Sequence, residues 1–358
     1  MAGVYISYPF CAQKCTYCNF ASGVFPRDLE PGYVEAVRAE LRHTDWPWTP
    51  ETVYLGGGTP SLIEPEALSS LLAEIPGEWT EATMEAAPGG ITPEKASAWR
   101  RAGIHRVSLG VQSFNTRELA RTGRKHTAEI VEREIAVLRG AGIGNFNVDL
   151  IAGLPGQTLE SWNHSLEWTE RLDAPHVSVY MLEVDEDSRL GAEVMAFGKR
   201  YGAPDIPSDD QIADFYEIAV ERLARAGIAR YEISNFARPG FESRHNLKYW
   251  RREPYLGFGA DAHSFDGTWR WQNAESIHDY LNGAKLERTS ADPVAERFFV
   301  GLRLSEGIDG SWAPFQSAIE RFIGEGLLET DGDRLRLTSR GVLLSNEVFA
   351  EFVGEPVA

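Results

Sequence analysis

The stretch YISYPFCAQKCTYCNF, residues 5–20, constrains the architecture most strongly, because it carries all three cysteines of the chain in the spacing C-x3-C-x2-C. Cys11, Cys15 and Cys18 directly follow a strand-like run, so three thiolates from one loop can converge on a cube of iron and sulfide. Such a cube has four irons, and three cysteines leave one iron without a protein ligand. An open position on a metal is where a cofactor or substrate coordinates. The spacing therefore predicts a 4Fe-4S cluster with one open iron.

The same three cysteines could in principle serve a disulfide framework or a zinc site. A disulfide framework is a poor fit, because the number is odd and the three residues are tightly packed in sequence. A zinc site is the stronger alternative, since three cysteines and a histidine form a common tetrahedral set. Structural zinc sites usually pair two short cysteine motifs, and this chain has no second one. The cluster remains the favoured interpretation, and zinc remains its alternative.

Beyond this loop, six short β-branched or apolar runs alternate with longer segments of helical spacing. This alternation is typical of βα units that build a parallel sheet. We expect strands at residues 4–7, 53–55, 83–86, 106–110, 146–151 and 177–182. Polar residues lie at the ends of the first five strands, which fits a closing barrel better than the single crevice of a doubly wound sheet. The predicted fold is α/β, a partial (β/α)6 barrel.

The composition excludes several classes of protein. The chain has 358 residues, of which 43% are hydrophobic and 25% are charged, and its formal net charge is −18. This acidic balance excludes broad binding to nucleic acid, which needs clustered basic residues. No apolar run approaches the roughly 18 to 20 residues that cross a bilayer, which leaves at most peripheral contact with a membrane. The N-terminus lacks the basic and apolar stretches of a secretion signal, so we expect a cytoplasmic protein.

The pattern of the chain loosens after about residue 185, which predicts more than one part. We expect a barrel with the cluster site over residues 1–200, a barrel-closing region over 201–290 and a C-terminal domain over 291–358. In the last part, Asp331-Gly332-Asp333 predicts a turn between two short strands. Its order of helices and hairpin is typical of a small α+β, winged-helix-like domain.

Candidate ligand-binding residues lie at the ends of the second to fifth strands. The run GGGT at residues 56–59 removes side chains where a ligand can approach the backbone and adds a hydroxyl donor, although it also fits a tight turn. Glu85 and Asp149 can accept hydrogen bonds from ammonium or ribose groups, and Arg124 can pair with a carboxylate. Gln112 follows the fourth strand. Each residue alone fits a solvated or capping role, so their shared placement carries the prediction.

Aromatic side chains mark two further places. Tyr17, inside the cysteine loop, can stack on an adenine or anchor the loop on the barrel rim. In RHNLKYW, residues 244–250, His245 can offer an axial ligand to heme iron, and Tyr249 and Trp250 offer flat surfaces for a porphyrin. Chemistry alone favours a packed, hydrogen-bonded cluster over a heme site, because histidine and aromatic residues at domain junctions are more often packed than ligating.

Six motifs in order resemble the HemW heme chaperones of the radical S-adenosylmethionine (SAM) superfamily: YISYPFCAQKCTYCNF, YLGGGTPS, GVQSF, NVDLIAGLPGQT, YEISNFARPG and HNLKYW. The resemblance covers at least residues 5–265 and implies that SAM binds the open iron of a cluster on Cys11, Cys15 and Cys18. It implies SAM contacts at Tyr5, Gly57, Gly58, Thr59, Glu85, Gln112, Arg124 and Asp149. It implies a heme motif at His245, Asn246, Tyr249 and Trp250. Ser7 departs from the family, which usually has a histidine there.

The resemblance implies a heme chaperone that binds heme and transfers it to an apo-hemoprotein of respiration, with a reducing electron donor as a further partner. It implies no catalytic residue. The alternative is the related oxygen-independent coproporphyrinogen III dehydrogenase, which removes two propionate carboxyls by radical chemistry. That enzyme typically has a fourth cysteine two residues past the third, where this sequence has Phe20. A zinc-stabilised barrel with a purely binding role is a third hypothesis.

Overall fold

The structure, a computed structural model, describes residues 2–284 and 287–353. Its centre is a twelve-stranded sheet in the order β12-β11-β10-β9-β1-β2-β3-β4-β5-β6-β8-β7. The six middle strands are parallel and lie side by side in chain order. They are β1 (Ala2–Tyr8), β2 (Pro50–Gly57), β3 (Glu81–Ala86), β4 (Arg106–Gln112), β5 (Asn145–Ala152) and β6 (His176–Met181). The prediction of six βα units in a partial barrel is confirmed.

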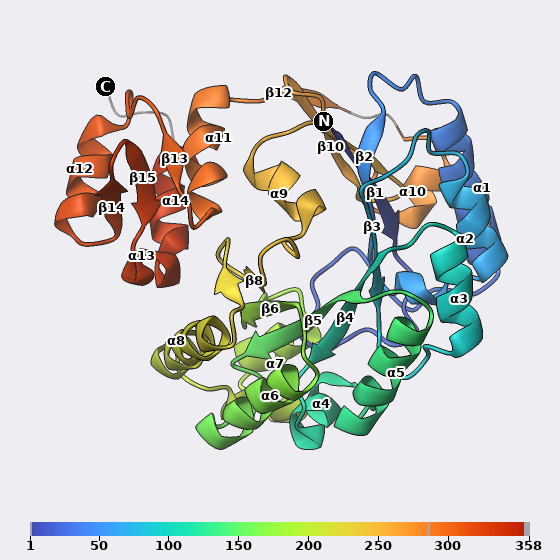
Figure 1. The fold of residues 1–358 in the computed structure, drawn as a ribbon, viewed down its shortest axis with the longest axis horizontal. Coiled ribbons are helices and arrows are strands. Elements are labelled where there is room, and N and C mark those ends of the chain that lie inside the picture. Colours follow the sequence, from blue (N-terminus) through green and yellow to red (C-terminus); the bar gives the residue numbers. More distant parts are fainter. Residues whose placement is uncertain (1, 285–286, 354–358) are drawn as a thin grey trace.

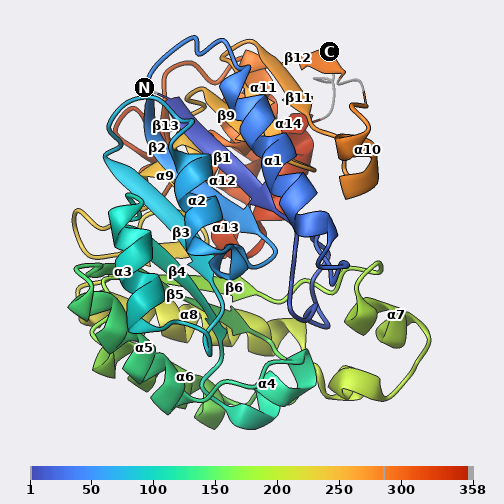
Figure 2. The same ribbon diagram turned by 90° about the vertical axis from the view of Figure 1, so that its right-hand side faces the viewer.

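Helices follow these strands and cover the outer side of the sheet, as Figure 2 shows for α1 to α3 in front of the strands. Amphipathic spacing gives most of these helices one apolar face that packs toward the sheet, whereas the helix over residues 189–195 packs on the turn over residues 200–205. Trp99 and Trp162 are fully buried in this layer, and the indole N–H of Trp162 donates to the Phe215 carbonyl at 2.7 Å. The helices are α1 (Leu29–Arg42), α2 (Pro65–Leu72), α3 (Pro93–Arg101), α4 (Thr116–Thr122), α5 (Ala128–Gly140), α6 (Leu159–Arg171), α7 (Arg189–Met195) and α8 (Asp209–Arg225).

The two edges of the sheet are extended by short strands that sequence analysis did not predict. At one edge β9 pairs in parallel with β1, and β10 to β12 continue in antiparallel order. At the other edge β8 pairs antiparallel with β6 and β7. The added elements are β7 (Ala229–Arg230), β8 (Asn235–Ala237), α9 (Arg244–Trp250), β9 (Tyr255–Phe258), β10 (His263–Phe265), β11 (Trp269–Gln272), α10 (Ile277–Leu281) and β12 (Arg288–Ser290).

The C-terminal domain lies apart from α1 to α3 and is drawn at the left of Figure 1. Its small sheet has the order β13-β15-β14, and Gly332 makes the hairpin turn with a φ of 59°. Phe298, Phe315 and Phe352 pack with ring centroids 5.1 Å apart in its core. Its elements are α11 (Pro293–Phe299), β13 (Ile308–Asp309), α12 (Gln316–Gly324), β14 (Leu328–Asp331), β15 (Arg334–Leu337), α13 (Ser339–Leu343) and α14 (Ser345–Val353). The predicted hairpin and α+β character are confirmed.

In the part of the chain that the structure describes, no helix is both long and apolar enough to cross a bilayer.

Candidate functional site

The three cysteines lie in the loop that follows the carboxyl end of β1. The Cys11 N–H donates to the Gly23 carbonyl at 2.8 Å, and the Gly23 N–H donates to the Pro9 carbonyl at 2.9 Å. Within the loop, the Cys18 N–H donates to the Cys15 carbonyl at 3.4 Å. All three thiols are unpaired and partly exposed. The backbone bonds to Gly23 thus close a loop that presents three free sulfur atoms.

The thiols lie in a partly buried environment with hydroxyl groups close by. Burial raises the pKa of the Cys11 thiol, hydrogen bonds with Ser22 and Thr59 lower it, and the two other thiols raise it again. Cys18 Sγ also lies 4.0 Å from Ser22 Oγ. Among the described residues, no three His, Cys, Asp or Glu side chains are close enough to hold a single metal ion. A cubane does not require such convergence, because each thiolate binds its own iron.

The glycine run at the end of β2 packs directly on the cysteine loop. A Cβ atom on Gly58 would lie 2.7 Å from the Phe10 carbonyl oxygen, which is too close for a side chain. The Gly58 N–H donates to the Tyr8 carbonyl at 2.8 Å, and the Thr59 N–H donates to the Phe10 carbonyl at 2.9 Å. Gly57 has a φ of 108°, which glycine adopts readily. The close neighbour of Gly58 is therefore protein backbone, whereas the SAM contact predicted for the run remains a prediction.

Glu85 lies beside the glycine run, inside the barrel. It accepts hydrogen bonds from the Tyr54 hydroxyl at 2.9 Å and from the Gly57 N–H at 3.2 Å. Burial and the negative charge of Asp149 raise the pKa of Glu85 from 4.5 to about 7. Tyr5 packs close by, with its ring 6.1 Å from that of Tyr54, and burial raises its pKa. Glu85 is thus close to half-protonated at neutral pH and can accept a hydrogen bond from a cationic ligand.

Gln112 ends β4, and Arg124, which follows α4, reaches back to this strand beside the cysteine loop. Gln112 has a φ of 69°, where the pairing of β4 becomes irregular. Nη1 of Arg124 donates to the Gly110 carbonyl at 2.6 Å. Burial lowers the pKa of Arg124, but the adjacent Tyr17 and Cys15 raise it overall. Its buried Nε finds no hydrogen-bond partner among the described residues, and an orphan donor beside the thiols fits the carboxylate of an amino acid ligand.

Asp149 belongs to a hydrogen-bonded group in the barrel interior. It accepts from the Ser108 hydroxyl at 3.2 Å and from the Asn147 amide at 2.6 Å. Burial raises its pKa, and hydrogen bonds from Ser178 and Asn147 lower it. The predicted SAM residues therefore occupy two neighbouring places, one beside the cysteine loop and one deeper in the barrel at Glu85 and Asp149.

The histidine motif lies at the opposite end of the barrel. α9 packs against the amino ends of β1, β2 and β3, near the N-terminus (Figure 1). Nδ1 of His245 hydrogen-bonds with the Thr52 hydroxyl at 2.9 Å, and Nε2 hydrogen-bonds with the Tyr249 hydroxyl at 2.7 Å. His245 is 1% exposed, and its burial lowers its pKa to about 3. Both ring nitrogens are thus used inside the fold, as the packed interpretation of this motif expects.

Two acidic residues, the buried Glu81 and the partly exposed Glu51, anchor α9 to the barrel. Glu81, the first residue of β3, accepts from the N–H groups of residues 244–245 at 3.1 Å each and from the Ser243 hydroxyl at 3.4 Å. Nζ of Lys248 lies 2.6 Å from a Glu51 carboxylate oxygen. A buried carboxylate with several donors fixes a helix end firmly, because removing it would leave those donors unsatisfied. The base of the barrel therefore holds α9 in one orientation.

The other motif residues do not approach the cysteines. The Arg303 guanidinium of the C-terminal domain lies 4.6 Å from the Trp250 ring, and the Tyr249 ring lies edge-on to Tyr255 at 4.6 Å. The Asn246 N–H donates to the Ser243 hydroxyl at 3.3 Å. The seven residues of β1 separate the motif from the cysteine loop, a distance of about 20 Å at ~3.3 Å per residue. The structure therefore places the predicted cluster site and the predicted heme motif at opposite ends of the barrel.

The barrel interior contains further buried polar residues that were not predicted from the sequence. Arg106 is only 2% exposed, and its Nε and Nη2 have no hydrogen-bond partner among the described residues. The Asn147 amide donates to the Ser178 hydroxyl at 2.9 Å, and its oxygen lies 2.6 Å from Nδ1 of His176. The signal was present in the strands RVSLGVQ, NFNVDLIA and HVSVYM, where polar residues alternate with buried apolar ones.

Comparison with known proteins agrees with this architecture. Residues 5–169 match the radical SAM superfamily, and residues 289–344 match the HemN C-terminal domain. The heme chaperone HemW of Lactococcus lactis subsp. lactis is 34% identical, with 98% of this chain and 96% of the relative covered. HemW of Mycobacterium tuberculosis is 36% identical, with 98% and 95% covered. This chain belongs to the HemW heme chaperone family. The predicted resemblance is thereby confirmed.

A solved structure adds support for the fold of this HemW family member. Coproporphyrinogen III oxidase (HemN) from Escherichia coli, described as a radical SAM enzyme, matches with a TM-score of 0.82. The match covers 98% of this chain and 89% of the enzyme, at 22% sequence identity. At that identity the likeness shows the fold and not the reaction.

Proposed function

We propose that this chain is a heme chaperone that binds heme and passes it to an apo-hemoprotein. The observation that carries the proposal is the similarity to HemW heme chaperones over 98% of the chain, with the motif helix α9 included. An apo-hemoprotein of respiration is the proposed acceptor, and a reducing protein is the proposed electron donor. The division into a barrel (1–200), a barrel-closing segment (201–290) and a C-terminal domain (291–358) belongs to the same proposal.

The barrel is proposed to hold a 4Fe-4S cluster and SAM. Cys11, Cys15 and Cys18 would hold the cluster, since soft thiolates are the ligands that iron-sulfur clusters take. The proposed SAM contacts are Tyr5, Tyr17, Gly57, Gly58, Thr59, Glu85, Gln112, Arg124 and Asp149. When bound and reduced, the cluster with SAM supplies one-electron chemistry at this end of the barrel.

Two of these side chains have clear electrostatic roles in the proposal. The orphan Nε of Arg124 suits a carboxylate, because a charge-assisted hydrogen bond satisfies a buried donor. Glu85 suits an ammonium group, because a nearby cation favours the charged carboxylate and lowers its raised pKa. When an amino acid binds between Arg124 and Glu85 near neutral pH, the fraction of Glu85 that is protonated should fall and protons should be released to solvent.

The motif helix is proposed to form the heme region with His245, Asn246, Tyr249 and Trp250. His245 acts there as a positioning residue, because its two ring nitrogens bind Thr52 and Tyr249 rather than facing solvent. Trp250 connects the helix to the C-terminal domain through Arg303.

The dehydrogenase alternative receives less support. Phe20 occupies the position of that enzyme's fourth cysteine, and its side chain is 66% exposed beside the loop. The likeness to HemN from Escherichia coli carries the fold alone.

The proposal is tested with anaerobically reconstituted full-length chain. Heme titration followed by difference absorbance should show saturable binding, and mixing with an apo-cytochrome of the b type should move the heme. His245→Ala should weaken heme uptake while iron and sulfide stay at about four each per chain, because α9 lies far from the cysteine loop. Incubation with coproporphyrinogen, SAM and reductant should give no protoporphyrinogen. Formation of that product, or unchanged heme uptake by His245→Ala, would overturn the proposal.

A further inference from the structure

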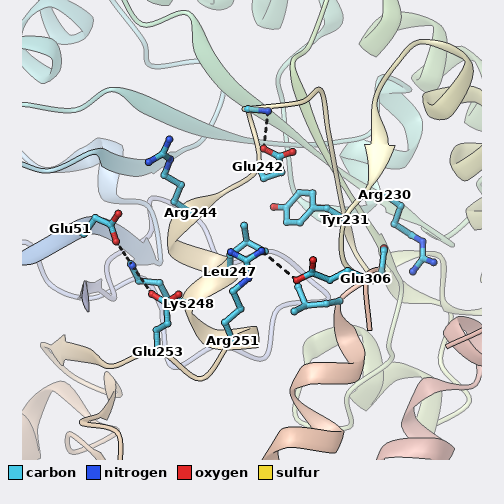
Figure 3. A pocket seen from close by; sticks show the side chains of 13 residues that line it. Glu51, Arg230, Tyr231, Glu242, Arg244, Leu247, Lys248, Arg251, Glu253 and Glu306 are labelled. Atoms are coloured by element: carbon cyan, nitrogen blue, oxygen red, sulfur yellow. Dashed lines mark hydrogen bonds and ion pairs between the residues drawn. The ribbon is translucent and has the colours of Figure 1, made fainter. Parts of the chain in front are cut away.

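A pocket of about 570 Å³ lies on the outer side of α9, between this helix and the C-terminal domain (Figure 3). Arg244, Leu247, Lys248 and Arg251 line it from α9. The spacing of these residues, i, i+3, i+4 and i+7, places them on one face of the helix. Residues 304–306 of the C-terminal domain line it from the other side. The motif helix thus turns its histidine into the barrel and three basic side chains into this pocket, whose lining also includes four carboxylates, those of residues 51, 242, 253 and 306.

Two cations of this face are available to a ligand. Lys248 is not, because Glu51 and Glu253 hold its Nζ at 2.6 and 3.0 Å (Figure 3). Arg244 is exposed, and the ion pairs found for α9 among the described residues involve Lys248 and Arg251 instead. Arg251 lies 3.4 Å from Glu306, and their side chains are 47% and 50% exposed, so this pair is weak.

The two arginines have a spacing that suits a ligand with two carboxylates. Seven residues of α-helix rise about 10 Å. The two arginine side chains are long and flexible, so their guanidinium groups can lie closer together or farther apart than this rise. A guanidinium pairs with a carboxylate through two parallel hydrogen bonds. In a chain with a net charge of −18, a dianion needs such local cations to overcome the general repulsion.

The walls of the pocket also suit a flat ring. Leu247 and Leu304 contribute apolar surface, and Tyr231 adds part of its aromatic ring, while its hydroxyl is held by His176 at 2.8 Å and by the Ser243 N–H at 3.2 Å. The volume falls within the roughly 300–1,000 Å³ of small-molecule sites.

We infer that this pocket takes heme by its carboxylate edge, with Arg244 and Arg251 pairing with the two propionates. The inference rests on the proposed heme function and assigns the binding face within it. A propionate that binds Arg251 replaces the ion pair of Arg251 with Glu306. Heme binding in the pocket is therefore coupled to the contact between α9 and the C-terminal domain. His245 contributes by fixing which face of α9 points outward.

The test compares heme with heme dimethyl ester, which lacks the two negative charges. Both are titrated into cluster-loaded full-length chain in the same dimethyl sulfoxide-containing buffer and followed by absorbance. Wild type should bind heme about tenfold more tightly than the ester, a difference of about 1.4 kcal/mol. The double variant Arg244→Gln, Arg251→Gln should lose that preference without losing affinity for the ester. Arg225→Gln, which removes an exposed arginine on α8, is the matched control and should behave as wild type.

The outcomes separate this inference from the proposed function. Equal affinity for heme and ester in the wild type, or an unchanged heme preference in the double variant, overturns the assignment of this pocket and leaves heme binding intact. Failure of both compounds to bind overturns the heme function together with the inference.

Discussion

Glu85→Gln tests whether Glu85 has the raised pKa that its surroundings in the barrel imply. Burial and the charge of Asp149 raise the pKa of Glu85 to about 7, whereas the unfolded chain titrates near its ordinary value of 4.5. Between these pH values the folded protein keeps a proton that the unfolded chain has released. The free energy of unfolding of the wild type therefore falls as the pH rises through this window. The full shift corresponds to about 3 kcal/mol, reached by about pH 8.

Glutamine cannot ionise, so the variant should lack this loss of stability. It keeps one acceptor oxygen for the Tyr54 hydroxyl or the Gly57 N–H, and losing the other hydrogen bond costs roughly 1 kcal/mol at every pH. The difference in unfolding free energy, variant minus wild type, should therefore grow by about 3 kcal/mol from about pH 4.5 to about pH 8. Urea unfolding of the chain without added SAM, followed by circular dichroism at several pH values, measures it.

Glu66→Gln on α2 is the control, because Glu66 is exposed and its substitution should give a nearly constant difference. A Glu85→Gln difference that stays flat across the same pH range would refute the reasoning. It would mean that the Glu85 carboxyl keeps its ordinary pKa in the folded protein.

Three further substitutions test the packing and the anchors. Gly58→Ala should lower the free energy of unfolding by about 1–3 kcal/mol and reduce bound iron, because its Cβ would meet the Phe10 carbonyl. Gly90→Ala is the control in thermal melts and iron assays, because a Cβ at Gly90 faces open space. Equal behaviour of the two variants would contradict the close contact at Gly58. Cys15→Ser should abolish the absorbance and the iron content of the cluster, and retention of full iron would exclude the proposed ligand set. Glu81→Ala should destabilise the chain by about 1–3 kcal/mol in urea, because it leaves buried donors of α9 unsatisfied; an unchanged midpoint would argue against the anchor.

The central strands were predictable because each is a short apolar run between amphipathic helices, a pattern that is local in sequence. The edge strands were not, because they are short and their pairing depends on distant segments. β9, for example, aligns Tyr255 with Gly3 of β1. Local periodicity in the sequence does not predict pairing between strands that are far apart in the chain. The edge strands of the sheet could therefore be identified only from the structure.

The site could be predicted as a set of residues but not as an arrangement. The cysteine spacing alone indicated the cluster loop, because its ligands lie in one short segment. The environment of His245 depends on Thr52, which is far away in sequence, so the sequence did not reveal which side of α9 faces the barrel. Gly58 was interpreted as space for a ligand, whereas its close neighbour is the backbone next to Cys11. Arg106 escaped attention because a lone arginine at the start of a strand usually reaches solvent.

The position of α9 at the base of the barrel would separate the two proposed iron groups, the cluster at the cysteine loop and the heme at α9. A reactive species formed at the cysteine loop would have to pass the side chains of Tyr54, Glu85 and Asp149 and then cross α9 to reach a porphyrin on its outer face. The fold would insulate the cargo from the cofactor, so that heme could be loaded and released without exposure to the strongly reducing end.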